Sequence, residues 1–322
     1  MILPAFLRCT GLLVILAGAG TFAVPQAQAR SVLYISDVFY PQWPDGYIRK
    51  VNTDRSRLEI VRAVGEGLRG FDIDLRNHAL YYADVEGPSI KRIDLATGNL
   101  QTVVDRRLSF PIGIALSVRS GELFWADQGL NQVGQSTWRG KYVRTYVAVP
   151  APTQVHLDSL GQQLYWSSFT AADAGVIQRA ALDGHGIETV IVGHGKPVDF
   201  AIDSAGGKIY WADYVQDVVR RANLDGTEVQ DLYAAAADLD PGSIALDITA
   251  GKVYWGQAAS PEDPNHQLIM RMNLDGSSPE EFLPALFGNI VALRIVSDDS
   301  HDAAFGGEET RDDRDGAGDV AR

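Results

Sequence analysis

Short segments that alternate hydrophobic and polar positions recur along the chain after its first 30 residues, and polar or glycine-containing turns separate them. One kind of segment is apolar at every second position, as in Phe200–Asp203 and Ile244–Asp247. Another ends in an Asp-Gly pair, as before Gly226, which is a strong hairpin signal because glycine tolerates positive φ. A period of two residues predicts β-strands. No segment after the first 30 residues shows a convincing helical pattern, so the chain is expected to be all-β.

An aliphatic residue, one or two aromatic residues, a small residue and often an aspartate recur together six times. The first aromatic residues of the copies are Tyr34, Tyr81, Phe124, Tyr165, Tyr210 and Tyr254, so 41 to 47 residues separate successive copies. This is the length of a four-stranded blade in a β-propeller. An alternating strand precedes the copies and two further strands follow each one. The pattern therefore predicts a six-bladed propeller with four antiparallel strands in each blade.

The copy at Ile209–Asp213, which reads Ile-Tyr-Trp-Ala-Asp, resembles the YWTD repeat, also called the LDL-receptor class B repeat. The resemblance covers about residues 31–297, and three copies are followed by Leu-Asp-Gly, as in the family. The resemblance implies a propeller whose repeated Tyr and Trp pack between blades and whose ligands bind on the loop face. We identify the chain as an exported, bacterial member. The departures are Ser168 and Gln257 in place of Asp, and Trp138-Arg139-Gly140 in place of Leu-Asp-Gly.

The order of the strands predicts how the ring closes. The first aromatic copy, at Leu33–Asp37, has almost no chain before it that could form an inner strand. The last alternating segment, at Val291–Val296, has no aromatic copy after it. We therefore expect the C-terminal strand to pair with the first blade and become its innermost strand, which removes the open edge of the ring. The Asp of each copy is expected to accept hydrogen bonds from the next blade.

The two ends of the chain differ in composition from the propeller at residues 30–297. Residues 1–29 have a short basic start, an apolar run and a small-x-small site before Arg30, as in a cleaved signal peptide. The only cysteine, Cys9, lies in this segment, so disulfides and a cysteine nucleophile are excluded from the mature chain. Residues 298–322 are rich in Asp, Glu, Gly and Arg, and we expect an acidic, disordered tail. The expected location is the periplasm or the exterior of the cell.

The charge of the chain argues against nucleic acid as a partner. The net charge is −13, and removal of residues 1–29 with the single Arg8 makes it −14. Such a surface repels phosphate backbones. No apolar stretch after the signal is long enough to span a membrane as a helix. We expect a monomer.

Loops that enter the first strand of a blade and loops that leave its second strand share one face of the disc in an antiparallel meander. Function tends to reside in such loops on a rigid scaffold. The first loop, around Phe39–Tyr47, is aromatic; it either anchors a partner or covers the closing blade, and the sequence leaves both open. The candidate ligand-binding residues on this face are Tyr40, Trp43, Arg69, Glu86, Phe110, Gln128, Phe169, Lys196, Tyr214, Asp240 and Phe287.

These observations favour a non-catalytic scaffold that binds a protein, peptide or glycan, because no catalytic motif is present. The alternative is a metal-dependent hydrolase similar to gluconolactonases, with a divalent cation such as Ca²⁺ in the channel. Its ligands would come from inner-strand residues: Asp72, Asp74, Asp158, Asp203 and Asp247. The repeat makes the last three equivalent and favours a role in turns or blade packing. His156 lies on an inner strand, where a hydrogen-bonded side chain is expected. No cofactor is predicted. A third hypothesis is a structural module in an envelope assembly.

Overall fold

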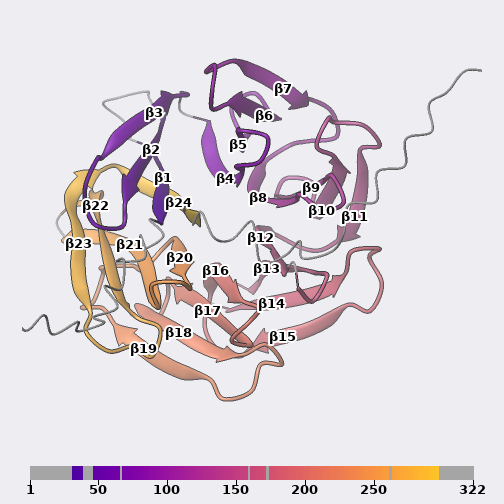
Figure 1. Ribbon diagram of the computed structural model, residues 1–322. Coiled ribbons are helices and arrows are strands. Elements are labelled where there is room, and N and C mark those ends of the chain that lie inside the picture. Colours follow the sequence, from indigo (N-terminus) through magenta and orange to yellow (C-terminus); the bar gives the residue numbers. More distant parts are fainter. Residues whose placement is uncertain are drawn as a thin grey trace, which may run out of the picture.

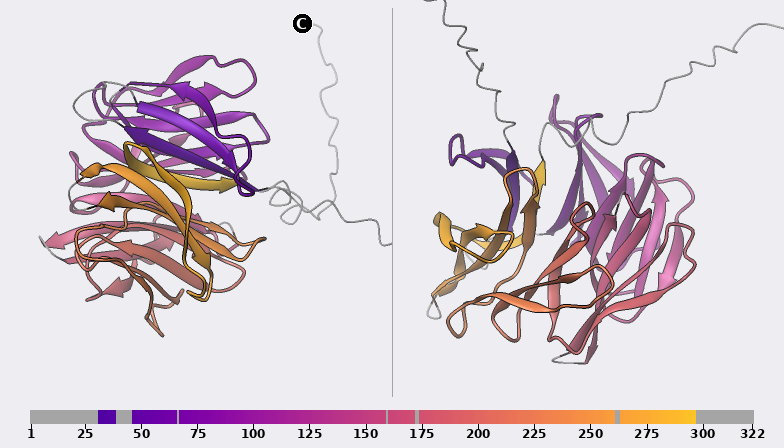
Figure 2. Two further views of the ribbon diagram at one scale, coloured as in Figure 1. Left: turned by 90° about the vertical axis from the view of Figure 1, so that its left-hand side faces the viewer. Right: turned by 60° about the horizontal axis from the view of Figure 1, so that its bottom comes forward.

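The computed structural model of the protein describes residues 31–38, 46–65, 67–158, 160–171, 174–260 and 263–296. These residues form six four-stranded antiparallel sheets arranged as blades around one axis (Figure 1). Seen from the side, the blades form a disc (Figure 2). The described part contains strands and turns but no helix, so it holds no helix that could cross a membrane. The six-bladed propeller is confirmed. The predicted signal peptide and acidic tail lie outside the described residues.

Each blade runs from an innermost strand at the axis to an outermost strand at the rim. Blade 1 contains β24 (Asn289–Val296), β1 (Val32–Val38), β2 (Gly46–Asn52) and β3 (Glu59–Ala63), and blade 2 contains β4 (Leu68–Asp74), β5 (Ala79–Asp84), β6 (Ser89–Asp94) and β7 (Leu100–Val104). Blade 3 contains β8 (Pro111–Ser117), β9 (Glu122–Asp127), β10 (Gln132–Thr137) and β11 (Arg144–Ala148), and blade 4 contains β12 (Pro152–Asp158), β13 (Gln163–Ala171), β14 (Ala174–Ala181) and β15 (Glu188–Val192). Blade 5 contains β16 (Pro197–Asp203), β17 (Lys208–Asp213), β18 (Val218–Asn223) and β19 (Gln230–Ala234), and blade 6 contains β20 (Ile244–Asp247), β21 (Lys252–Ser260), β22 (Asp263–Asn273) and β23 (Glu280–Phe287).

The ring closes in blade 1, as the order of the strands predicts. Strand β24 pairs antiparallel with β1 from Val32 opposite Val296 to Val38 opposite Asn289. Figure 1 shows this last strand, in yellow, beside the first one, in indigo. The side chains of Ile290 and Leu293 on β24 are buried. Closure therefore combines a hydrogen-bonded ladder with hydrophobic burial.

The repeated aromatic residues pack between neighbouring blades, as expected. The first aromatic residue of one blade shares a core cluster with the second aromatic residue of the next, as with Tyr165 and Trp211 or Tyr210 and Trp255. At the closing joint, Tyr254 of blade 6 meets Ile35 of blade 1, which stands at the position of the second aromatic residue. All these side chains are almost fully buried. Burial of such large side chains is the main source of stability between blades.

The aspartate of the repeat fixes the loop that enters its own blade. Asp127 accepts hydrogen bonds from the backbone N–H groups of Ser109 and Phe110, both at 2.9 Å, and Asp213 accepts one from Lys196 at 3.1 Å. The expectation that this aspartate would bond the next blade is therefore wrong. The end of the second strand lies beside the start of the inner strand of the same sheet, so the nearest unpaired N–H groups belong to that blade's entry loop.

Three arginines tie their blade to the next one, and we call each of these contacts an arginine clasp. Each lies on the third strand, opposite the first aromatic residue of the repeat, and donates a hydrogen bond to a backbone carbonyl of the following blade. The clasps are Arg179 to Leu224 O (3.0 Å), Arg221 to Leu274 O (2.8 Å) and Arg271 to Thr53 O (3.3 Å). Each arginine also binds an acceptor on its own outer strand, namely Glu188, Gln230 or Glu280. We call the contact between two neighbouring blades a joint. The clasps therefore hold the joints between blades 4 and 5, blades 5 and 6, and blades 6 and 1.

The turn between the third and fourth strands packs against the outer strand of the preceding blade. A Cβ atom on Gly226 would lie 2.0 Å from the carbonyl oxygen of Val190, and one on Gly140 would lie 1.8 Å from that of Val103. Both glycines also have positive φ, 82° and 71°. These positions thus require glycine for space as well as for backbone conformation.

Candidate functional site

A cavity of about 460 Å³ opens at one end of the propeller axis, and we call it the mouth. Residues at the start of five inner strands, or directly before the sixth, form its wall, together with the ends of second strands and the loops entering inner strands. Its lining residues are Arg69, Gly70, Ile112, Thr153, Gln154, Phe169, Val198, Asp199, Tyr214, Asp240, Gly242, Ser243, Ala258, Gln267, Asn289, Ile290 and Val291. The mouth therefore lies on the loop face that the sequence indicates.

Four of the candidate residues line the mouth: Arg69, Phe169, Tyr214 and Asp240. They belong to four blades and come together only because the ring closes. A fifth candidate, Lys196, places its Nζ 4.2 Å from the centre of the Phe169 ring. This is the geometry of a cation–π contact between blades 4 and 5. Tyr214 is 49% exposed, so its ring is available at the rim of the mouth.

The other candidates are placed elsewhere or are not described. Phe110 and Gln128 lie together on blade 3, where the Gln128 N–H donates to the Phe110 carbonyl at 3.0 Å, but neither lines the mouth. Glu86 is exposed beyond the end of β5 in blade 2. Tyr40 and Trp43 lie outside the described residues, and Phe287 ends β23 with a side chain outside the described part.

The charged groups of the mouth come from different blades: Arg69 from blade 2, Asp199 from blade 5 and Asp240 from the loop that enters blade 6. Burial raises the pKa of Asp240, and the neighbouring Asp217 carboxyl raises it further. Arg69 stands on blade 2 and donates to the carbonyl of Leu68 at 2.8 Å. A ligand in the mouth would therefore meet a guanidinium from blade 2 and carboxyl groups from blade 5 and from the entry to blade 6.

Two buried polar atoms at the base of the mouth have no hydrogen-bond partner among the described residues. They are Oε1 of Gln154 and Oγ of Ser243, on residues that are 4% and 3% exposed. Leaving such a group unpaired costs roughly 1–3 kcal/mol, so a ligand that supplies a donor recovers that free energy. The sequence reasoning missed both residues. The signal is their position: Gln154 lies near the start of β12 and Ser243 directly precedes β20, next to the loops that enter these strands.

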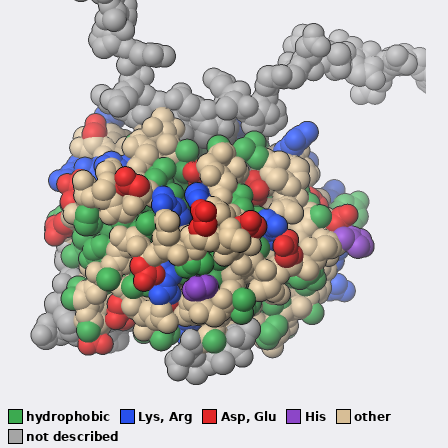
Figure 3. All heavy atoms as spheres, turned by 90° about the horizontal axis from the view of Figure 1, so that it is seen from below, with side chains coloured by type: hydrophobic (Ala, Val, Ile, Leu, Met, Phe, Trp, Pro, Cys, Tyr) green, Lys and Arg blue, Asp and Glu red, His purple; other side chains and the backbone are tan. Residues whose placement is uncertain are grey.

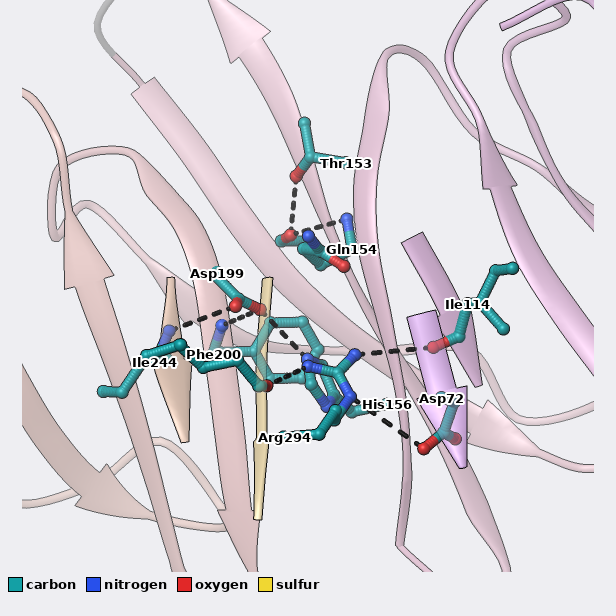
Figure 4. Close-up of polar contacts among 11 residues, drawn as sticks. Asp72, Ile114, Thr153, Gln154, His156, Asp199, Phe200, Ile244 and Arg294 are labelled. Carbon is teal, nitrogen blue, oxygen red and sulfur yellow. Dashed lines mark hydrogen bonds and ion pairs between the residues drawn. The ribbon is translucent and has the colours of Figure 1, made fainter. Parts of the chain in front are cut away.

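Below the mouth, side chains from several inner strands meet in the channel (Figure 4). His156 Nε2 lies 3.0 Å from Asp199 Oδ1, and the other oxygen of Asp199 accepts the Ile244 N–H at 3.1 Å. Burial lowers the pKa of His156, and the charge of Arg294 lowers it further against the opposing effect of Asp199. The expectation that His156 is a hydrogen-bonded side chain is confirmed.

Arg294 of blade 1 makes the corresponding contacts on the opposite side of the channel. Its Nη2 donates to the Ile114 carbonyl of blade 3 at 3.5 Å, and its Nε lies 3.9 Å from Oδ1 of Asp72 in blade 2. Asp72 also accepts the Leu116 N–H at 2.8 Å. Burial raises the pKa of Asp72, and Arg294 opposes that rise. The middle of the channel is thus filled by paired groups that join neighbouring inner strands.

The remaining acidic candidates on the inner strands serve turns. Each accepts a backbone N–H three residues further on, as expected for Asp158, Asp203 and Asp247. The pairs are Asp74 with Asn77 (3.1 Å), Asp158 with Gly161 (2.9 Å), Asp203 with Gly206 (2.7 Å) and Asp247 with Ala250 (2.9 Å). Within the described ranges, no three His, Cys, Asp or Glu side chains gather as a metal site requires. These carboxylates therefore lend no geometric support to the hydrolase hypothesis.

Curated relatives of the chain are receptors and receptor-related proteins. No family model matches the chain. A "Vitellogenin receptor" of Solenopsis invicta is 28% identical over 170 residues, which cover 51% of this chain and 9% of the relative. A "Low-density lipoprotein receptor-related protein 1" of Pyricularia oryzae is 34% identical over 111 residues, or 29% of this chain and 36% of the relative. A human "Low-density lipoprotein receptor-related protein 5-like protein" is 24% identical over 181 residues, or 53% and 69%. The match thus spans about a tenth and a third of the first two relatives.

Solved structures show the same fold at low sequence identity. The nidogen/laminin complex contains a chain with a TM-score of 0.70 and 18% identity, with 83% of this chain and 98% of that chain aligned. TolB from Acinetobacter baumannii has a TM-score of 0.67 and 14% identity, with 83% of this chain and 66% of that chain aligned. The chain is therefore a six-bladed propeller whose homologues include LDL-receptor-related proteins. Its bacterial and exported origin stays a prediction.

Proposed function

We propose that the chain is a binding scaffold whose mouth holds a segment of a partner protein or a peptide. One observation carries the proposal: the closed ring gathers Arg69, Phe169, Tyr214 and Asp240 around the unpaired buried oxygen of Gln154. Exposed aromatic and arginine side chains are the usual anchors of protein interfaces. A donor on the partner, such as an amide or hydroxyl group, would pair the buried oxygen and fix the register.

The comparisons support a protein partner. The relatives are named as receptors or receptor-related proteins, and the nidogen structure is that of a complex with laminin. The identity of the partner of this chain is part of the proposal, as is the export that would bring the two together. An expected N-terminus at Arg30 tests the export: the protein isolated from its native host should lack residues 1–29 by mass spectrometry.

A peptide selection tests the mouth. Peptides are selected from a displayed random library on the immobilised protein, and their affinities are measured by calorimetry for the wild type and for Tyr214→Ala and Phe169→Ala. We expect each substitution to weaken binding roughly five- to thirtyfold, since an aromatic anchor contributes on the order of 1–2 kcal/mol. Tyr142→Ala is the matched control, because Tyr142 is 81% exposed and does not line the mouth. Selected peptides that bind all four proteins equally would refute the proposal.

A further inference from the structure

The joint between blades 2 and 3 has the arginine of a clasp but no clasp. Arg92 on β6 lies opposite Tyr81, as Arg179 lies opposite Tyr165 in blade 4. Yet Arg92 reaches only acceptors of its own blade, the Asn77 carbonyl at 3.4 Å and the Asp94 carboxylate at 3.7 Å. Its guanidinium, which also bonds the Tyr81 hydroxyl, makes no contact across the joint among the described residues and lines the space between the two blades.

At the joint without a clasp, the turn of blade 3 has Trp138-Arg139-Gly140 in place of Leu-Asp-Gly. In the Leu-Asp-Gly turns, the aspartate accepts the N–H two residues further on at 2.9 Å; these aspartates are Asp183, Asp225 and Asp275. In blade 3, Thr137 performs this role, because its Oγ1 accepts the Lys141 N–H at 3.1 Å. Arg139 is thus left out of the turn, exposed, and without an ion pair in the described part of the chain. The substitution replaces a negative charge with a positive one.

A cleft of about 360 Å³ lies where the clasp would be. Its walls carry two guanidinium groups, a phenol, an indole and three further polar side chains. The lining residues are Asn77, Tyr81, Arg92, Gln101, Thr102, Val103, Trp138 and Arg139. Burial raises the pKa of the Tyr81 hydroxyl against the opposing charges of Arg92 and Arg139, so this hydroxyl remains a donor at neutral pH. The cleft offers many donors and contains no carboxylate.

A second hollow, of about 640 Å³, is formed in part by the residues that directly follow the same turn. It is lined by Arg106, Arg107, Lys141, Tyr142 and Val143, and Arg107 donates to the Val143 carbonyl at 3.3 Å. Cations therefore line both hollows next to this turn, although the whole chain has a net charge of −13. On the side of the disc shown in Figure 3, by contrast, Lys and Arg side chains lie among Asp and Glu side chains.

We propose that this turn binds an acidic saccharide chain, with one carboxylate or sulfate group between Arg92 and Arg139. Arginine binds such groups through paired, charge-assisted hydrogen bonds. The Trp138 indole offers a flat apolar wall to a sugar ring, and the side chains of Asn77 and Gln101 can bond its hydroxyl groups. Further acidic units of the chain reach Arg106, Arg107 and Lys141. The site is separate from the mouth and does not depend on the function proposed for it.

The test uses the substitution Arg139→Asp, which restores the residue type found in the three other turns and should preserve the fold. Binding of a heparin-derived hexasaccharide and of an oligogalacturonate is measured by calorimetry and by tryptophan fluorescence. We expect Arg139→Asp and Arg92→Gln each to weaken binding of at least one of these probes tenfold or more, because each removes a charge-assisted contact. Arg119→Asp is the matched control. It makes the same charge change at an exposed position of the same blade, outside both hollows, and should weaken binding less than twofold.

Two further probes and one variant test whether the site selects acidic saccharides. A neutral cello-oligosaccharide should not bind, and poly-glutamate of equal charge should bind at least tenfold more weakly than the better acidic saccharide. Tyr214→Ala, which alters the mouth, should leave saccharide binding unchanged, so that the two proposals can fail independently. Three results would overturn the proposal: neither acidic saccharide binds, Arg139→Asp and Arg119→Asp weaken binding equally, or poly-glutamate binds as tightly as the saccharides.

Discussion

The joint after blade 5 and the joint after blade 2 are built from the same repeat but use their arginine differently. Arg221 donates to Leu274 O of blade 6 at 2.8 Å, whereas the contacts of Arg92 stay within blade 2. The turns that face the two arginines also differ, since one carries Asp275 and the other Arg139. A repeated structural position can thus become an available binding group when one residue of the neighbouring repeat changes.

The largest effect is expected at the closure of the ring, where β24 pairs with β1. A truncation that ends at Phe287 removes β24 and exposes the core around Leu33 and Ile35. Loss of Ile290 and Leu293 costs about 1.5–3 kcal/mol for each buried side chain, before the ladder is counted. The sum approaches the total stability of a typical domain, so we expect no cooperative thermal transition. A chain that ends at Val296 is the control. Full thermal stability of the shorter chain would refute closure by β24.

Substitution of the turn glycines should lower the free energy of unfolding equally at joints with a clasp and at the joint without one. Gly140→Ala and Gly226→Ala each add a Cβ within about 2 Å of a carbonyl oxygen at positive φ, and we expect a loss of about 2–3 kcal/mol from strain and overpacking. Gly186→Ala is the control. It has φ of 70° but open space around the added Cβ, so about 1 kcal/mol is expected from the backbone alone. Urea denaturation measures all three. A cost at Gly140 no larger than at Gly186 would contradict the packing described for blade 3.

Substitution of the arginines should lower the free energy of unfolding by different amounts at the two joints. Arg221→Gln removes a clasp and should lower the free energy of unfolding by about 1–2 kcal/mol, since Arg221 makes charge-assisted bonds at a partly buried position. Arg92→Gln should cost less than about 0.5 kcal/mol, because the contacts of Arg92 stay within its own blade and add nothing across the joint. Urea denaturation at fixed ionic strength compares them. Equal costs would mean that Arg92 contributes to the joint as much as a clasp does.

The smallest expected effect is the pH dependence of stability that His156, in the channel, contributes. Its pKa in the folded protein is lowered by burial, so below the unfolded pKa of about 6.5 the unfolded chain binds more protons than the folded one. Stability is therefore lost as the pH falls from 7 to 5. The raised pKa of Asp72 gives a slope of opposite sign, so the test is the difference between the wild type and His156→Gln. We expect the wild type to lose up to about 1 kcal/mol more over this range, and thermal melts at several pH values measure it.

The propeller could be predicted almost completely from the sequence because its information is periodic. Six aromatic copies at blade spacing fix the strands, and the unmatched strand at Val291–Val296 fixes the closure. The mouth could be predicted only in part. Phe169 and Tyr214, near the ends of second strands, follow from strand order, but Gln154 lies inside β12 and Ser243 directly precedes β20. Their role depends on which inner-strand side chains meet at the axis.

The saccharide cleft could not be predicted from the sequence, for a different reason. The Trp138-Arg139-Gly140 departure is visible in the sequence, but its consequence depends on the pairing of Tyr81 with Arg92 and on the docking of this turn against Val103. Neither contact is local in the sequence. Likewise, the partners of Asp127 in its own entry loop follow from the three-dimensional position of a strand end, which the repeat pattern alone does not specify.

The pairing of β24 with β1 also sets the order of events during synthesis. A ribosome releases β1 early and β24 after every other described strand, so the opening blade has one unpaired edge for most of the time the chain is being made. That exposed edge is open to wrong pairing, including pairing with a second nascent chain. The ring can close only after β24 has emerged. Closure therefore depends on residues that are translated some 250 positions after the β1 residues with which they pair.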